Sequence, residues 1–274
     1  SEGAYMSIGM SGYQPPPQII ETLQEYYSAI LEYYDELFPV DESVVSFFRA
    51  LQEEQKALFT EGRAPLIRFL GIGCATGTLE NKLAGVGLDI TGIDRNPEMI
   101  ETAKRRMKRG FSTTRFFEMA TLDMVRYLKK GSFNIIACLD NTLPYLADET
   151  LLRKFFHDAR ELLAPGGKLV IHTLNYDSIP LTKPSRLPDR SSVRVTLKQG
   201  YLPDPDGAFL LDATLELGNG RKIALQKGTK VLPLTTGKVE ALAREAGFSA
   251  CALAGSFSRD PWSPDRAESI IILG

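Results

Sequence analysis

The chain has 274 residues, of which 43% are hydrophobic, and its formal net charge is −2. This length and apolar content predict one large α/β domain, or one with a small appendage, and exclude a disordered chain. Because 32 Lys and Arg residues nearly balance 34 Asp and Glu residues, no global field would attract nucleic acid or an anionic membrane. We therefore expect a small-molecule partner, with no nucleic acid and no membrane.

The three cysteines, Cys74, Cys138 and Cys251, are odd in number and do not indicate a disulfide framework. His157 and His172 are the only histidines, and no Cys, His and carboxylate cluster has metal-ligand spacing, so we predict no metal site. No apolar stretch is long enough to span a membrane, and the first ten residues lack the charged and apolar regions of a signal peptide. These features predict a cytoplasmic location.

The first predicted elements are two helical segments, at residues 18–38 and 42–59, where apolar residues recur with helical spacing. We expect them to form a helical cap over a ligand site, within residues 1–62. The first segment is aromatic on more than one face, which a simple amphipathic helix does not need. Tyr27 and Tyr34 are therefore candidates for ligand contact, although packing onto a sheet would explain them equally well.

The next segment, LIRFLGIGCATG at residues 66–77, is a short apolar strand that runs into a glycine-rich loop. Gly71, Gly73 and Gly77 are spaced along the loop, and a helical stretch follows at 78–84. Glycines allow the backbone to approach a ligand that side chains would keep away. The segment therefore predicts the first half of a βαβ unit that binds a nucleotide-like ligand.

A second predicted strand, at residues 88–94, ends on an acid that comes 17 positions after Gly77. At the carboxyl end of this strand, Asp94 could accept a hydrogen bond from each hydroxyl of a ribose. Alternatively, Asp94 caps the following helix at 96–107. Pro97 favours the ligand role, because proline suits an early helical position and leaves Asp94 free.

Three further strand-and-loop segments follow in order: FFEMATLDM at 116–124, FNIIACLDNTLPYL at 133–146 and LLAPGGKLVIHT at 162–173. The last one predicts a helix end, a Pro-Gly-Gly turn and a fifth strand. Ligands bind at the carboxyl ends of the strands in open α/β sheets, so the loop at 140–145 should face the reacting group.

The α/β alternation then stops, and residues 191–232 contain three runs with two-residue periodicity, separated by turn sequences. They predict an antiparallel meander inserted near the substrate site, because about forty residues bury little core alone. A helix at 236–246 and a final antiparallel pair at 248–257 and 268–273 complete the main sheet.

The ordered segments within residues 64–177 resemble the class I S-adenosylmethionine-dependent methyltransferases, whose first motif is an acid, an apolar residue and GxGxG. The resemblance implies a Rossmann-like, doubly wound seven-stranded sheet with an antiparallel last strand, built from residues 63–190 and 233–274. Two residues depart from the motif. Gly71 stands where the family usually has the acid that lies near the methionine ammonium, and Ala75 replaces the middle glycine, which is tolerated if its φ is negative.

The resemblance also implies the cofactor, S-adenosyl-L-methionine, and the residues that bind it. The acid expected beside the adenine amino group is Asp123. In many small-molecule members a YYD segment like the one that ends here in Asp35 folds over the cofactor. The implied cofactor residues are Gly71, Ile72, Gly73, Cys74, Ala75, Gly77, Asp94, Arg95, Met99, Asp123, Met124, Leu139, Asn141, Tyr27 and Tyr34.

Two loops, CLDNTLPYL and HTLNYD, resemble those of the glycine and sarcosine N-methyltransferase group. They imply that Tyr145, Asn175 and Tyr176 contact the substrate, although buried tyrosines with satisfied hydroxyls are an equal alternative. Arg259 is a further candidate, for a substrate carboxylate. No catalytic residue is assigned, because displacement at a sulfonium carbon requires alignment more than a dedicated base.

These features together predict methyl transfer from S-adenosylmethionine to a nitrogen or oxygen of a small molecule. A nicotinamide-dependent oxidoreductase is one alternative, but the glycines follow GxGxxxG and not the dinucleotide GxGxxG. A catalytically inactive methyltransferase-like partner subunit is another, because Gly71 and Ala75 depart from the motif. The methyl acceptor and the oligomeric state stay open.

Overall fold

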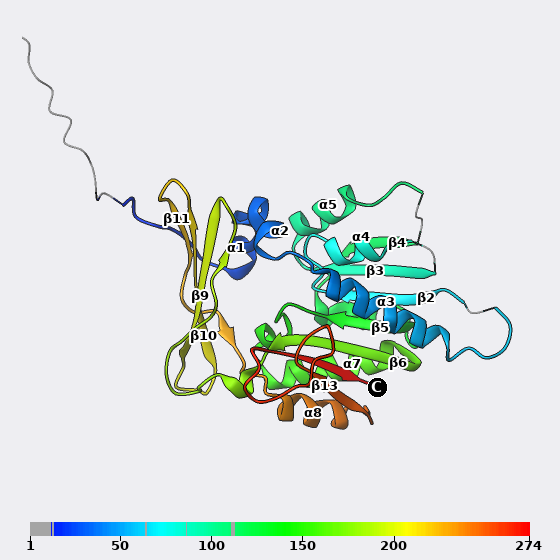
Figure 1. Cartoon of the computed structure of the whole chain (residues 1–274). Coiled ribbons are helices and arrows are strands. Elements are labelled where there is room, and N and C mark those ends of the chain that lie inside the picture. Colours follow the sequence, from blue (N-terminus) through cyan, green and yellow to red (C-terminus); the bar gives the residue numbers. More distant parts are fainter. Residues whose placement is uncertain (1–11, 13, 64, 86, 111–112) are drawn as a thin grey trace, which may run out of the picture.

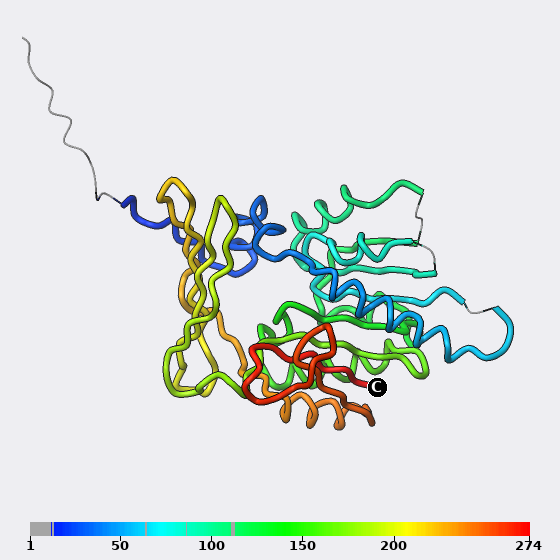
Figure 2. Tube along the Cα trace, in the orientation of Figure 1, coloured from blue at the N-terminus to red at the C-terminus, as the bar shows by residue number. Residues whose placement is uncertain are grey.

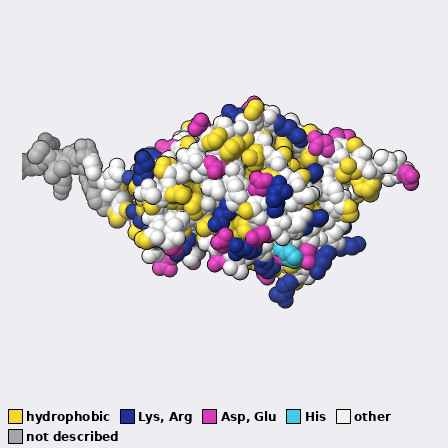
Figure 3. Space-filling view, turned by 90° about the horizontal axis from the view of Figure 1, so that it is seen from below, with side chains coloured by type: hydrophobic (Ala, Val, Ile, Leu, Met, Phe, Trp, Pro, Cys, Tyr) yellow, Lys and Arg dark blue, Asp and Glu magenta, His cyan; other side chains and the backbone are white. Residues whose placement is uncertain are grey.

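The computed structural model describes residues 12, 14–63, 65–85, 87–110 and 113–274. The segment examined for a signal peptide, and the beginning of the expected cap, lie outside these residues. Two sheets stand beside each other, with the short helices near the N-terminus between them (Figure 1). On the face shown in Figure 3, cationic and anionic side chains are interspersed.

The main sheet confirms the predicted Rossmann-like fold. Its strand order is β13-β14-β6-β5-β2-β3-β4, and β14 pairs antiparallel with both of its neighbours. All six residues of β5 are buried, as expected for a parallel strand that is covered on both faces. The strands are β2 (Ile67–Ile72), β3 (Leu88–Asp94), β4 (Thr114–Glu118), β5 (Phe133–Cys138), β6 (Leu163–Leu174), β13 (Cys251–Ala254) and β14 (Glu268–Leu273).

Helices cover both faces of the main sheet. On one face, α3 (Glu42–Lys56) and α4 (Thr78–Leu83) pack through an aromatic and aliphatic cluster. On the other, α7 (Glu149–Leu162) and α8 (Thr236–Glu245) pack against each other and the strands. The remaining helices are α1 (Leu23–Ala29), η1 (Leu31–Tyr33), α2 (Tyr34–Leu37), α5 (Pro97–Arg105), η2 (Thr121–Asp123), α6 (Met124–Tyr127), η3 (Leu143–Leu146) and η4 (Tyr176–Ser178).

The second sheet contains the predicted antiparallel meander. Alternate residues of its two longest strands are buried in a core cluster that also includes strands of the main sheet. This shared core explains how a short insertion holds its place. The strands are β1 (Gln18–Ile20), β7 (Ser185–Arg186), β8 (Arg190–Ser191), β9 (Val195–Pro203), β10 (Phe209–Leu217), β11 (Lys222–Leu225) and β12 (Lys230–Val231).

The N-terminal segment corrects the expectation of one helix over residues 18–38. Gln18–Ile20 form a strand that pairs parallel with β11. The Thr22 side chain accepts a hydrogen bond from the Glu25 backbone N–H, so the first helix begins only at Leu23. Figure 2 follows this segment from the edge of the second sheet toward the main sheet.

Two strand boundaries also differ from the expectation. The Pro-Gly-Gly sequence is part of β6, which begins at Leu163 and shifts register against β5 after its first pair. Gly166, with φ of 77°, supplies the left-handed conformation of this irregularity. The predicted strand at 248–257 is shorter, because only Cys251–Ala254 pair with β14.

Candidate cofactor and substrate site

A cavity of about 560 Å³ lies at the carboxyl ends of the main-sheet strands. Its walls come from α1 and α2, from the loops after β2, β3 and β5, and from the turn between β11 and β12. It is therefore enclosed partly by the main sheet and partly by the second sheet. Eight of the predicted site residues line it: Tyr27, Tyr34, Gly73, Ala75, Asp94, Arg95, Met99 and Tyr145.

A smaller cavity, of about 50 Å³, lies beside the large one, and the two share Tyr34, Phe38 and Asp140 in their walls. Both also touch the glycine loop between β2 and α4. Four more predicted residues line the smaller cavity: Gly71, Ile72, Cys74 and Leu139. The loop after β2 therefore borders both spaces.

The glycine loop has left-handed conformations at three positions, Gly73, Ala75 and Gly77, with φ of 65°, 50° and 70°. The condition under which alanine would be tolerated, a negative φ at Ala75, is therefore not met, and its methyl group costs about 1 kcal/mol relative to glycine. Gly77 lines neither cavity. A Cβ there would lie 2.7 Å from Ala103 Cβ, so this glycine serves helix packing.

Asp94 lies at the end of β3 and faces the large cavity. Its two carboxylate oxygens accept hydrogen bonds from the backbone N–H groups of Ala75 and Asn96, both at 2.9 Å. Burial raises the pKa of Asp94, and these two hydrogen bonds oppose the rise. The alternative role as helix cap is wrong, because the Asn96 side chain caps α5 by accepting from Glu98 and Met99.

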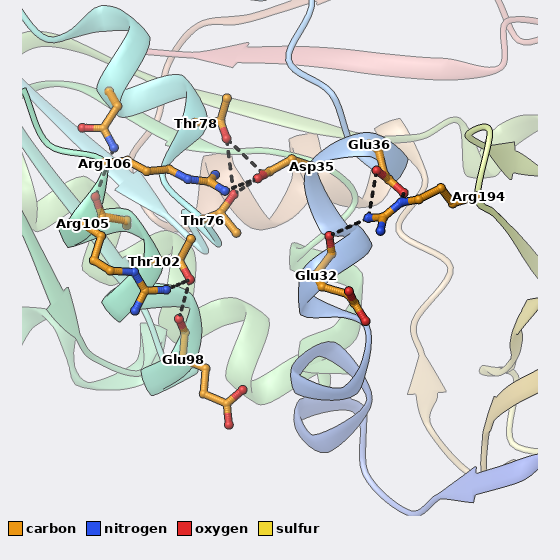
Figure 4. Close-up of polar contacts among 12 residues, drawn as sticks. Glu32, Asp35, Glu36, Thr76, Thr78, Glu98, Thr102, Arg105, Arg106 and Arg194 are labelled. Atoms are coloured by element: carbon orange, nitrogen blue, oxygen red, sulfur yellow. Dashed lines mark hydrogen bonds and ion pairs between the residues drawn. The ribbon is translucent and has the colours of Figure 1, made fainter. Parts of the chain in front are cut away.

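The α2 helix contacts both halves of the molecule through adjacent acids (Figure 4). Asp35 accepts hydrogen bonds from the hydroxyls of Thr76 at 2.6 Å and Thr78 at 3.3 Å, and it pairs with Arg106. Burial alone would raise the pKa of Asp35, but the Arg106 and Thr76 hydrogen bonds hold it below the ordinary value. This group, Asp35 with Thr76, Thr78 and Arg106, is called the α2 clasp below.

Glu36, the next residue of α2, points to the second sheet. Its carboxylate accepts a hydrogen bond from Arg194 at 3.1 Å (Figure 4). It accepts another from the Ser192 hydroxyl, also at 3.1 Å. Asn96 gives a further link, because its side chain donates to the Ser28 hydroxyl at 3.1 Å and so ties α1 to the start of α5. The N-terminal helices are therefore held at the mouth of the large cavity.

The loop after β5 contains two successive left-handed residues, Asp140 and Asn141, with φ of 55° and 58°. Asn141 does not line either cavity. Its side chain donates to the Tyr201 hydroxyl at 2.8 Å and accepts from the Tyr176 hydroxyl at 2.9 Å. Burial raises the pKa of Tyr176 well above the ordinary value, so its hydroxyl stays protonated. Asn141 and Tyr176 are thus used in a buried network between the two sheets.

His172 of β6 positions the backbone of Asp140. Its Nδ1 accepts the Asp140 backbone N–H at 3.1 Å, so the proton of the neutral ring is on Nε2. That N–H donates to Glu268 of β14 at 2.8 Å. These two hydrogen bonds hold the backbone of Asp140, which lies in the walls of both cavities.

Four other predicted residues line neither cavity. Met124 and Asn175 are buried, and the Asn175 amide donates to backbone carbonyls of the loop before β14. Asp123 borders a third hollow, of about 660 Å³, which shares Arg95 and Met119 with the large cavity. Arg259 pairs with Glu54 of α3 at 3.2 Å and therefore does not reach the expected substrate site.

Several cavity residues were missed by sequence reasoning. Most lie in irregular loops, where no periodic signal marks them. Glu80 is an exception, because it is an acid on the buried face of α4 beside Leu79 and Leu83. The missed residues include Phe38, Glu80, Asn96, Met119, Thr121 and Lys230.

The part of the chain that the structure describes contains no group of three or more His, Cys, Asp or Glu residues arranged to hold a metal ion. Within the same ranges, no helix is both long and apolar enough to cross a membrane. Cys74, Cys138 and Cys251 are all free thiols.

Comparison with known proteins identifies a domain and a shared fold. Residues 69–167 match a family model described as a methyltransferase domain. An S-adenosylmethionine-dependent methyltransferase from Clostridium acetobutylicum ATCC 824 superposes with a TM-score of 0.70 at 14% identity, over 90% of this chain and 98% of that one. Over residues 69–167 the chain therefore matches a methyltransferase domain, and it shares the fold of this solved structure.

Other matches to the methyltransferase domain differ in the acceptor that their names state. The ubiquinone biosynthesis O-methyltransferase of Xanthomonas euvesicatoria pv. vesicatoria (strain 85-10) is 29% identical over 109 residues, 39% of this chain and 43% of that protein. The sugar N-methyltransferase KedS8 from Streptoalloteichus sp ATCC 53650 superposes with a TM-score of 0.60 at 15% identity, over 98% of both chains. The chain spans about half the length of the curated relatives it matches.

Proposed function

We propose that this protein transfers the methyl group of S-adenosylmethionine to a nitrogen or oxygen atom of a small molecule. The observation that carries the proposal is the large cavity, in which the glycine loop, Asp94 and two tyrosines of the N-terminal helices face one space. The second sheet closes the far side of this space. A site of this kind can hold a cofactor and an acceptor together.

The residues around the cavity fit the cofactor. Asp94 already accepts one backbone N–H on each oxygen, and each oxygen keeps a further lone pair for a ribose hydroxyl. Met99 and Met119 offer apolar surface to an adenine ring. Tyr27 and Tyr34 cover the loop from the N-terminal side. When bound, S-adenosylmethionine supplies an electrophilic methyl group on a sulfonium.

The acceptor would lie between the loop after β5 and the second sheet. Tyr145, Thr142 and Asp140 line this side of the cavity. The backbone of Asp140 is held by His172, so its carboxylate is in place to accept a hydrogen bond from an amine or hydroxyl. Aromatic walls exclude water, and the fixed loop aligns the acceptor for an in-line displacement.

Isothermal titration calorimetry with S-adenosylhomocysteine tests the proposal. We expect binding to the unaltered chain and a loss of about 1 to 3 kcal/mol in Asp94→Ala, through the missing ribose hydrogen bonds. Asp89→Ala is the matched control, because Asp89 is on the same strand and pairs with Arg68 and Arg115 away from the cavity. Unchanged affinity in Asp94→Ala would remove this residue from the site, and no binding to the unaltered chain would overturn the function.

Two further measurements separate the alternatives. Tight binding of NADH, followed by fluorescence of Trp262, would favour an oxidoreductase over a methyltransferase. Retained cofactor affinity without turnover on a panel of amines and hydroxyl compounds would favour an inactive partner subunit. With an acceptor in hand, Asp140→Asn should lower kcat/KM by a larger factor than it lowers the affinity for S-adenosylhomocysteine.

A further inference from the structure

Glu80 is a buried acid that the structure leaves without a counter-charge. It lies on α4, is 4% exposed and borders the smaller cavity. Its own backbone N–H is the only hydrogen-bond donor beside its carboxylate among the described residues. Burying an ionised carboxylate costs several kcal/mol unless a cation or hydrogen-bond donors compensate. The Glu80 carboxyl group is therefore either protonated or compensated by a cation in the cavity.

The Glu80 carboxylate occupies the space that a side chain at position 71 would need. A Cβ on Gly71 would lie 2.3 Å from Glu80 Oε1 and 3.1 Å from its carboxyl carbon. Real Cβ atoms do not approach an oxygen so closely, so a side chain at position 71 would have to displace the Glu80 carboxylate. The glycine at the end of β2 thus admits an acid that α4 supplies from nine positions further along the chain.

The smaller cavity has room for a small group only. Its volume of about 50 Å³ excludes an adenine ring, and it borders the large cavity at Tyr34, Gly73 and Asp140. A ligand that fills the large cavity could therefore extend one small end toward Glu80. Asp94 and Asp140 are the other charged groups near Glu80, and both are negative, which favours a cation at this end.

We infer that Glu80 binds the α-ammonium group of S-adenosylmethionine in the smaller cavity. The inference rests on the proposed function. Of the cofactor's two cations, only the ammonium has N–H groups to donate to a carboxylate, whereas the sulfonium has none. Adenine and ribose are neutral and are too large for this space. Glu80 is therefore a positioning residue that holds the methionine end of the cofactor and so aligns the methyl group.

The role proposed for Glu80 implies that its carboxyl group loses a proton when the cofactor binds. Burial, with smaller contributions from Asp140 and Asp94, raises the pKa of Glu80 to about 8. At neutral pH the carboxyl is then mostly protonated when the cavity holds no cation. An arriving ammonium favours the ionised form and lowers this pKa, so cofactor binding should release a proton to the buffer. Cys74 and Tyr34 also line this cavity, and burial raises the pKa of both, so the thiol and the phenol stay protonated.

Calorimetry with two ligands tests the inference. S-adenosylhomocysteine carries the ammonium, and 5′-methylthioadenosine lacks the whole amino-acid end. We expect Glu80→Gln to weaken S-adenosylhomocysteine binding about ten- to a hundred-fold and to leave 5′-methylthioadenosine unaffected. Glu101→Gln, an exposed acid on α5, is the matched control and should change neither affinity.

Relocating the acid sharpens the test. In Gly71→Asp with Glu80→Ala, a carboxylate returns to the same space from the β2 side, and the affinity for S-adenosylhomocysteine should recover relative to Glu80→Ala. Titrations in phosphate and in Tris at pH 7 should show proton release by the unaltered chain and none by Glu80→Gln.

The outcomes are distinguishable. If the unaltered chain binds both ligands and Glu80→Gln binds S-adenosylhomocysteine equally well, the inference is overturned and the proposed function stands. Equal weakening of both ligands would also overturn it, since a general distortion of the loop would then explain the loss. If neither ligand binds the unaltered chain, the proposed function fails and the inference fails with it.

Discussion

The two sides of the large cavity are built in different ways. On the main-sheet side, the loop after β2 and the end of β3 are organised within one βαβ unit, with Asp94 accepting from Asn96, two positions away, and from Ala75, 19 positions away. On the other side, the second sheet is held by contacts between distant segments, such as Asn141 with Tyr201 and Glu36 with Arg194. The comparison suggests that cofactor binding depends on local geometry and acceptor binding on how the two sheets are joined.

The largest expected effect is on the main-sheet side, where the buried Glu80 should make the free energy of unfolding depend on pH. The folded-state pKa of Glu80, about 8, lies above the unfolded value near 4.5. The protonated form therefore stabilises the fold fully below about pH 4.5, and this stabilisation is lost as the pH rises through 8. Urea unfolding should show that the unaltered chain loses a few kcal/mol relative to Glu80→Gln between pH 5 and 9. Parallel pH profiles for the two proteins would contradict the burial argument.

The second effect breaks the join between the sheets. Asn141→Ala leaves the Tyr201 and Tyr176 hydroxyls and the Leu174 backbone N–H without this partner. We expect the free energy of unfolding to fall by about 2 to 3 kcal/mol. Asn219→Ala, in an exposed turn of the second sheet, is the control and should cost less than about 1 kcal/mol. Equal losses would mean that the network does not join the sheets.

A third prediction separates the two acids of α2. Asp35→Ala removes the α2 clasp and should lower the free energy of unfolding by about 1 kcal/mol, and hydrogen exchange should quicken in the glycine loop. Glu36→Gln weakens the contact with Arg194, so exchange should quicken near Arg194 and not in the glycine loop. If hydrogen exchange quickens at the same amides in Asp35→Ala and Glu36→Gln, the two acids do not serve different sides of the cavity.

The smallest effect concerns backbone strain in the glycine loop. Ala75 has φ of 50°, a conformation that glycine adopts without steric cost. Ala75→Gly should therefore raise the free energy of unfolding by up to about 1 kcal/mol. Ala147 also has a positive φ, 56°, and lies on the cavity wall outside the loop, so Ala147→Gly is the matched comparison. A destabilised Ala75→Gly protein would show that the methyl group packs favourably.

The sequence predicted the parts of the site that short-range patterns control. The strand ending at Asp94 was predicted with the bounds that the structure has, because its residues are β-rich and an acid closes the run. Arg259 and Asn175 were placed wrongly for a common reason. Both are polar residues in loops, and whether such a side chain faces a cavity or a neighbouring element depends on packing that no local pattern records.

By itself, the sequence determined the Rossmann-like sheet, the glycine loop and the acid at the end of β3. Hydrophobic periodicity, turn residues and chain order act over a few residues and can be recognised without coordinates. Only the tertiary structure decided that Glu80 fills the space beside Gly71 and that α2 connects the two sheets. Those contacts depend on the rotation of each helix against the sheet, which is set by the packing of the whole core.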